Sequence, residues 1–231
     1  MVLAGVALGA VSVMALTGFA SSAALAVLIA TGGLMLPPWG IAADPRVAQA
    51  TSLKNAGLDA EKVKQLDAEA EKLLEAGKYA EAMAIVARTL AWNEAILGPK
   101  HPDTATSLNN LAWLYCSQGL YAKAEPLNQR ALAIREKALG PEHPDTAQSL
   151  NNLAELYKTQ GLYAKAEPLY KRALAINEKA LGPENPTTAI SLNNLAALNH
   201  NQGLYARAEP LYQRALAIRE KALGPEHPIL L

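Results

Sequence analysis

The sequence predicts an all-α fold of stacked helix pairs, and three observations carry that prediction. Dipeptides that end in proline recur at intervals of 42 residues (143 − 101, 185 − 143 and 227 − 185). Between them, apolar residues recur three and four positions apart, which is the period of one face of an α-helix. Glycine interrupts each unit near its middle, and Gly-Pro interrupts it near its end. A fixed period of this length is typical of stacked supersecondary units rather than of one globular core. The four dipeptides are His101-Pro102, His143-Pro144, Asn185-Pro186 and His227-Pro228.

The N-terminal segment, residues 1–43, contains no Asp, Glu, Lys or Arg. Its apolar part exceeds the roughly 20 residues that a helix needs to cross a bilayer. We therefore expect a hydrophobic N-terminal helix, either a signal peptide cleaved after Ala43 or an uncleaved membrane anchor. Basic residues, Arg46 and Lys54, follow the segment but none precedes it, so a retained anchor would leave the repeats in the cytoplasm. The protein is thus expected to be exported (periplasmic or secreted) or membrane-anchored.

Residues 44–58 are expected to form a linker, and residues 59–100 a divergent first repeat. Gly77 and Tyr79 lie 42 residues before the equivalent glycine and tyrosine of the next unit. Asp59 can cap the first helix of this repeat. The repeat lacks the His-Pro opening, and an atypical end repeat is expected because one of its faces meets solvent.

Three close copies follow, over residues 101–142, 143–184 and 185–226, and residues 227–231 open an incomplete repeat. Each copy is expected to fold as two antiparallel helices, with proline in the first turn and glycine after the last. No polar helix closes the last copy. Either the sequence is a fragment of a longer protein, or the uncapped repeat meets a partner, self-association being one case. The stripes in the first copy are Leu108, Leu111, Ala112 and Tyr115, and then Ala124, Leu127, Ala131, Ile134 and Ala138.

These residues resemble the tetratricopeptide repeat, and the 42-residue length resembles the kinesin light chain type. The phrases HPDTATSLNNLA and YAKAEPL carry that resemblance. It implies a right-handed superhelical solenoid of antiparallel helix pairs, with a concave groove lined by the first helix of each pair. It implies little about function, because the repeat occurs in many unrelated proteins. The matching positions are Leu108, Ala112, Tyr115, Gly119, Tyr121, Ala124 and Ala131.

The three close copies differ from one another mainly on one face of the first helix, at 106/148/190, 113/155/197, 116/158/200 and 117/159/201. An asparagine shares that face and does not vary. In the kinesin light chain type, equivalent asparagines hold a ligand backbone, and the resemblance implies that role here. Alternatively, solvent-facing positions drift because nothing constrains them, and Trp113 merely packs. The expected peptide-binding residues are Asn109, Asn151, Asn193, Thr106, Trp113, Cys116, Gln148, Glu155, Lys158, Ala197 and His200.

The balance of charges and the absence of known catalytic motifs limit the functions that the sequence predicts. The 21 basic and 21 acidic residues balance, so the chain lacks the basic footprint of a nucleic-acid-binding protein. We expect no catalytic residue, no metal site and no cofactor, because the histidines recur in separate loops and no phosphate-binding loop or HExxH motif is present. The preferred function is a protein–protein interaction scaffold that binds an extended peptide. The alternatives are the regulatory portion of a longer enzyme and a structural assembly protein.

Overall fold

The computed structural model describes residues 59–223, and within that range it contains eight α-helices and no strand. This confirms the all-α repeat fold. The chain divides into two compact units, Met1–Gln118 and Gly119–Leu231. None of the helices between residues 59 and 223 is both long and apolar enough to span a bilayer. The expected signal peptide or anchor, the linker and the opening of a further repeat lie outside the described residues.

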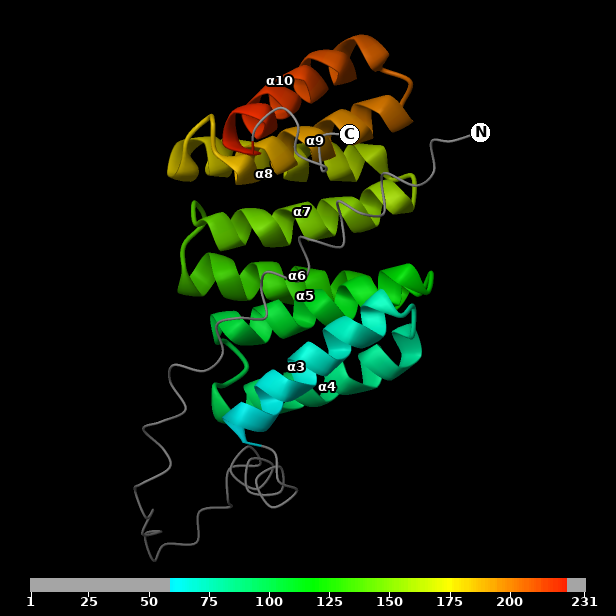
Figure 1. The fold of residues 1–231 in the computed structure, drawn as a ribbon, viewed down its shortest axis with the longest axis vertical. Helices are drawn as coiled ribbons and strands as arrows, with labels where there is room; N and C mark the ends of the chain where they lie inside the picture. Colours follow the sequence, from blue (N-terminus) through cyan, green and yellow to red (C-terminus); the bar gives the residue numbers. More distant parts are fainter. Residues whose placement is uncertain (1–58, 224–231) are drawn as a thin grey trace, which may run out of the picture. The chain divides into compact units, whose positions relative to one another are not determined.

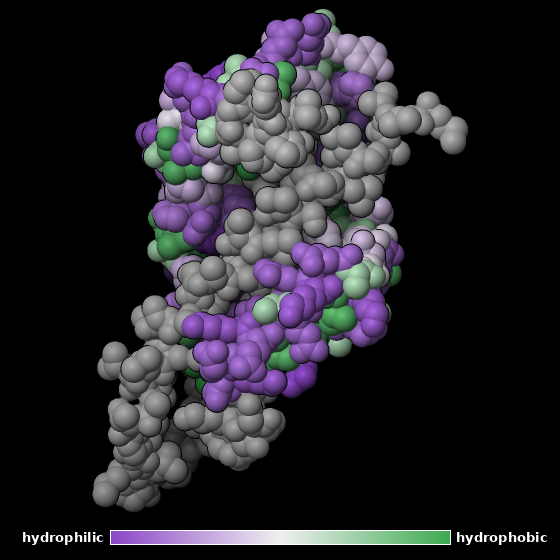
Figure 2. Space-filling model, viewed as in Figure 1, coloured by the Kyte–Doolittle hydropathy of each residue, from purple (hydrophilic) through white to green (hydrophobic). Residues whose placement is uncertain are grey.

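Unit 1 contains α3 (Ala60–Glu75), α4 (Tyr79–Ile96) and α5 (Pro102–Ser117). Helix α3 packs on α4, and α4 packs on α5. Helix α3 begins at Asp59, whose carboxylate accepts a hydrogen bond from the Lys62 backbone N–H at 2.8 Å. One face of α3 is buried, while the surface visible in Figure 2 is mostly hydrophilic. A hydrophilic outer face is typical of an end repeat in such an array.

Unit 2 contains five helices that lie in layers in chain order (Figure 1). Each helix packs on the next, and α7 also contacts α9. We call α5, α7 and α9 first helices and α6, α8 and α10 second helices. The five are α6 (Tyr121–Ala138), α7 (Pro144–Thr159), α8 (Tyr163–Leu181), α9 (Pro186–Asn201) and α10 (Tyr205–Leu223).

The recurring dipeptides form the start of each first helix. The Nδ1 atom of His143 accepts a hydrogen bond from the Asp145 backbone N–H at 3.1 Å, so the histidine is a helix cap. The proline after it occupies the first turn, where no backbone donor is needed. Gly140 precedes the cap with φ of 98°, and its carbonyl accepts from the hydroxyl of Thr146 at 2.8 Å. The motif therefore fixes the turn between consecutive helix pairs.

Small clusters of buried apolar residues join consecutive repeats. Leu150 and Ile176 form one cluster with two alanines, and Leu132 from the preceding second helix packs against it. The cluster around Leu192 is completed in the same way by Leu174 of α8. Each hairpin therefore buries its core partly on its neighbour, as expected for a repeat array.

The exposed faces of the second helices carry a regular series of ion pairs. Arg172 pairs with Glu136 at 2.7 Å, and Arg214 pairs with Glu178 at 2.6 Å, in each case from one second helix to the previous one. Lys179 pairs with Glu142 at 2.6 Å. Exposed pairs of this kind contribute little to stability individually. The pairs recur because the same charged residues recur at the 42-residue period.

Asp67 on α3 gives unit 1 a predicted pH dependence. Burial, together with the charge of the nearby Glu71, raises the pKa of its carboxyl group from 3.8 to about 7, although a hydrogen bond from Thr89 opposes the shift. Between about pH 4 and pH 7 the carboxyl group therefore keeps its proton in the folded state and has lost it in the unfolded state. The contribution of Asp67 to the free energy of unfolding is fully present below about pH 4 and is lost as the pH rises to about 7. We expect Asp67→Asn to raise the free energy of unfolding at pH 8 by up to about 3 kcal/mol and to flatten its pH dependence.

Chemical denaturation of the full chain at pH 5 and pH 8 measures this effect. Glu69→Gln, a neutralised carboxylate on the exposed side of α3, is the control and should change neither value appreciably. Equal or lower stability of Asp67→Asn at pH 8 would show that the buried carboxylate is tolerated in its charged form.

Candidate peptide-binding face

Each first helix exposes one narrow stripe of side chains. In α7 the stripe consists of Gln148, Asn152, Glu155 and Thr159, which follow one another at intervals of four, three and four residues. These residues are partly or fully exposed, while most residues on either side of them are buried. Residues at this spacing share one helix face. We call this face the open stripe; its other members are Ile190, Asn194, Ala197 and Asn201 in α9, and Thr106, Asn110, Trp113 and Ser117 in α5.

The asparagines expected to hold a ligand border the open stripe and are engaged with the protein. Asn151 is 7% exposed, and its amide donates to the hydroxyl of Ser191 on α9 at 3.5 Å. Asn193 faces Arg219, and its oxygen, when the amide is oriented towards the guanidinium, accepts from Nη1 at 3.2 Å and also from Nη2. Asn109 of α5 is 4% exposed. We call Asn109, Asn151 and Asn193 the inner asparagines; whether they contact a ligand stays a prediction.

A second asparagine follows each inner one directly and lies on the open stripe. Asn152 and Asn194 are partly exposed, and neither side chain makes a hydrogen bond to another residue of the described range. Their amides therefore keep both donors and an acceptor for a ligand. We call Asn110, Asn152 and Asn194 the outer asparagines. They were not predicted from the sequence, although they recur at the 42-residue period as strictly as the inner asparagines.

The variable positions of α7 have structural partners. The hydroxyl of Tyr170 on α8 donates to Oε2 of Glu155 at 2.7 Å, and the ammonium of Lys158 contacts the same carboxylate at 2.7 Å. Burial and the neighbouring carboxylate raise the pKa of Tyr170 well above its usual value, so the hydroxyl remains a donor. Gln148 accepts from Arg135 at 3.2 Å. The face is therefore ordered by internal contacts before any ligand binds.

Aromatic side chains lie near the stripes of α5 and α9. The ring of Trp113 lies 6.3 Å from that of Tyr79 on α4, so the indole packs partly against its own unit. The His200 ring, which is exposed, lies 5.1 Å from that of Tyr205 and nearly perpendicular to it. The other expected residues are a partly buried Thr106, Cys116 and Ala197. No group of three potential metal ligands occurs among residues 59–223.

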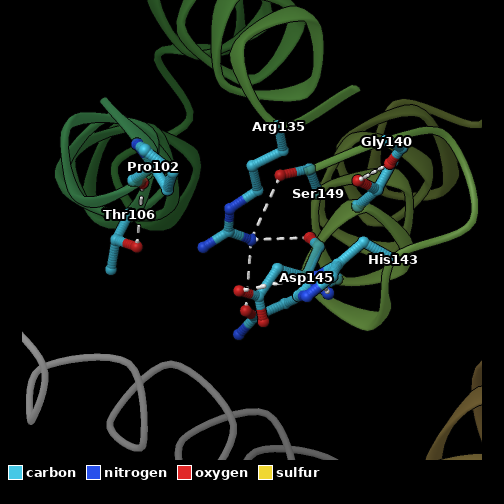
Figure 3. A network of polar contacts seen from close by, with 9 residues as sticks. Pro102, Thr106, Arg135, Gly140, His143, Asp145 and Ser149 are labelled. Atoms are coloured by element: carbon cyan, nitrogen blue, oxygen red, sulfur yellow. Dashed lines mark hydrogen bonds and ion pairs between the residues drawn. The ribbon is translucent and has the colours of Figure 1, made fainter. Parts of the chain in front are cut away.

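A buried polar contact joins α4, α6 and α8 each to the first helix that follows it. Arg135 of α6 is 3% exposed, and its Nη1 donates to the carbonyl of Asp145 at 2.8 Å and to the hydroxyl of Ser149 at 3.2 Å (Figure 3). Forty-two residues later, Asn177 donates to Ser191 at 2.9 Å. In unit 1, Asn93 donates to Ser107 at 2.7 Å. We call residues 93, 135, 177 and 219 the junction positions.

The junction positions were not anticipated from the sequence, although a signal was present. They read Asn, Arg, Asn, Arg along the chain, an alternation with twice the repeat period. A polar residue that recurs inside an apolar stripe indicates a buried hydrogen bond, because an unpaired polar group there would be costly.

Comparison with known proteins places this geometry among helical repeats. A family profile described as "Tetratricopeptide repeat" matches residues 68–137, 114–179, 153–221 and 187–231. A search against curated proteins found no match.

Solved structures with similar folds include BtubC (BKLC) from P. vanneervenii, at 26% identity and a TM-score of 0.59. That match covers 69% of this chain and 63% of the other, so this chain spans less than two thirds of BtubC. A kinesin light chain-type protein of Podosopora anserina with nearly identical TPR-like repeats matches at 27% identity and a TM-score of 0.56, over 77% of this chain and 85% of the other. A glutamine-to-methionine variant of that protein gives 27% identity and a TM-score of 0.58, over 76% and 84%.

Proposed function

Because the chain belongs to the tetratricopeptide repeat family, we propose that it is a protein–protein interaction scaffold that binds an extended polypeptide along its open stripes. The resemblance to kinesin light chain-type repeats is confirmed by the similar structures. The observation that carries the proposal is the recurrence of a partly exposed, unengaged asparagine on each of the helices α7 and α9.

The chemistry of the stripe suits an extended main chain. Each outer asparagine offers an amide N–H and a carbonyl oxygen, the two groups that a peptide bond needs as partners. Between the asparagines the side chains change from one helix to the next, from Gln148 and Glu155 on α7 to Ile190 and Ala197 on α9. The constant amides would then hold the ligand backbone, and the changing neighbours would select its side chains.

Paired alanine substitutions test the proposal, because the chain supplies its own control. The probe is the tightest binder selected from a displayed library of unstructured 15-residue peptides. We expect the double substitution of Asn152 and Asn194, the outer asparagines of unit 2, to weaken its binding at least tenfold, since two hydrogen-bonding groups are lost, while the melting temperature changes little. The matched double substitution of the inner asparagines Asn151 and Asn193 should lower the melting temperature, because both hold internal contacts.

Three results are informative. Loss of binding with the outer set alone supports the proposal. Loss of binding with the inner set at unchanged stability would instead support the ladder expected from the family resemblance. Unchanged binding with both sets would show that the peptide does not bind through the asparagines of the first helices.

The location of the scaffold is a second part of the proposal. We propose export or membrane attachment through residues 1–43, because this segment carries no charge and is long enough to span a bilayer. Cell fractionation with sequencing of the mature N-terminus tests it. A soluble cytoplasmic protein that retains Met1 would contradict both forms of the proposal.

A further inference from the structure

The apolar faces of the repeats in unit 2 are nearly identical. The cluster on α7 and α8 consists of two alanines, a leucine and an isoleucine, and Leu132 of α6 packs against it. The cluster on α9 and α10 consists of the same four residue types, and Leu174 of α8 packs against it. By its apolar contacts alone, α6 could therefore stack on α9 as well as on α7, and the hairpin formed by α7 and α8 would be left out.

The buried polar contacts between consecutive repeats do differ. At the junction of α6 and α7, Nη1 of Arg135 donates to the carbonyl of Asp145 at 2.8 Å (Figure 3). The same nitrogen donates to the side chain of Gln148 and to the hydroxyl of Ser149, each at 3.2 Å. A guanidinium carries five N–H donors and needs several acceptors when it is buried. Helix α7 supplies three.

Helix α9 offers fewer acceptors at the next junction. The hydroxyl of Ser191 accepts from Asn177 of α8 at 2.9 Å and from Asn151 of α7 at 3.5 Å. A hydroxyl oxygen has two lone pairs, so both are used. Ile190 stands where α7 has glutamine, and its side chain supplies no acceptor. An arginine placed against α9 would leave most of its donors buried without a partner, which is costly.

The reverse exchange is better tolerated. An asparagine placed against α7 can still donate to Ser149, as Asn177 donates to the equivalent serine of α9. Gln148 would lose its partner, but it is only partly buried, so water can solvate its amide. The discrimination therefore acts mainly at α9, which accepts asparagine and rejects arginine.

We propose that the residue pairs 135/148 and 177/190 fix the order in which the repeats of unit 2 stack. Because α9 rejects Arg135, α6 stacks on α7, and the hairpin between them in the sequence is retained. Wrong pairing between similar units is a characteristic way in which repeat proteins misfold. The alternation of arginine and asparagine at the junction positions counters it, whether or not a ligand binds the open stripe.

A double-mutant cycle in the full-length chain tests whether the paired residues are matched. We expect Asn177→Arg to lower the melting temperature by about 5 °C or more when residue 190 is isoleucine. In the presence of Ile190→Gln the same substitution should lower it by less than half as much, because glutamine supplies an acceptor. A loss that is independent of residue 190 would overturn the proposal.

Refolding tests the order of the repeats, which a merely stabilising contact would not affect. In a first variant, Arg135→Asn and Gln148→Ile make the two junctions identical. In a second variant, Asn177→Arg and Ile190→Gln are added, so the junctions differ again but in exchanged order. Each full-length chain is unfolded in urea and diluted. The measurement is the fraction that regains the helix content and the elution volume of the native protein.

We expect the variant with identical junctions to leave a misfolded fraction about twofold or more larger than that of the parent, and the exchanged variant to refold like the parent. Equilibrium unfolding of the same three proteins provides the control for stability. Complete refolding of the variant with identical junctions, or equally poor refolding of the exchanged variant, would overturn the proposal. A misfolded fraction that follows equilibrium stability instead of the identity of the junctions would overturn it as well.

Discussion

Leu150→Ala is expected to lower the free energy of unfolding by about 3 to 4 kcal/mol, the largest effect that we anticipate for a single substitution. Leu150 is fully buried on α7, in a cluster whose other members include Ala147 and Ala173. The alanines have no flexible side chains that could move into the space, so a cavity would remain. Because Leu132 of α6 packs on the same cluster, the loss should also loosen α7 from α6.

Thermal and urea unfolding, followed by circular dichroism, measure the loss. Leu162→Ala, the same change at a side chain that is 39% exposed, is the control and should stay within about 0.5 kcal/mol of the parent. Equal effects of the two substitutions would mean that the cluster around Leu150 does not hold the repeats together.

Arg135→Ala is expected to cost about 2 to 4 kcal/mol, because it removes a buried charged donor and leaves the Ser149 and Gln148 acceptors without it. Arg135→Asn should recover a large part of the loss, since asparagine occupies the equivalent junction at Asn177 and reaches the serine there. Urea unfolding of the full chain compares the two variants.

The exposed Arg172, which pairs with Glu136, provides a control of the same residue type. Arg172→Ala should change the free energy of unfolding by less than about 1 kcal/mol. If Arg135→Asn were as damaging as Arg135→Ala, the serine contact would not be the feature that stabilises the junction.

The helices follow closely from local sequence, and the reason is periodicity. Proline fixes the first turn of each first helix, glycine supplies the positive φ between repeats, and the apolar spacing selects the buried face. Each signal acts within a few residues of its effect. The recurrence of these signals at 42 residues made the repeat architecture predictable before any contact was known.

The candidate site was only partly predictable, because its details depend on contacts between helices. The varied positions did indicate the open stripe, to which Glu155 and Ala197 belong. Neighbouring residues on a helix differ by about 100° in direction, so the choice between Asn151 and Asn152 needs the position of the next helix. The hydrogen bond from Tyr170 to Glu155 likewise joins two helices, so it cannot be recognised from the sequence of either helix alone.

At one buried position tyrosine is replaced by asparagine in the last copy, and the effect of this change on the contacts could not be predicted from the sequence. Tyr157 donates from α7 to Glu125 of α6 at 2.7 Å, whereas its counterpart Asn199 donates to the carbonyl of Leu195 in its own helix at 3.0 Å. The sequence showed that a polar residue replaced tyrosine. It did not show that a contact between repeats was exchanged for one within a helix, because the partner lies 32 residues away.

Site-specific photo-crosslinking tests most directly whether a peptide binds on the open stripe. A benzophenone amino acid is placed at Asn152 or Asn194 on the open stripe, and at Lys171 or Gln213 on exposed parts of the second helices. After irradiation with the selected peptide, we expect covalent adducts at the two stripe positions and none at the other two. Adducts confined to the second helices would contradict this expectation.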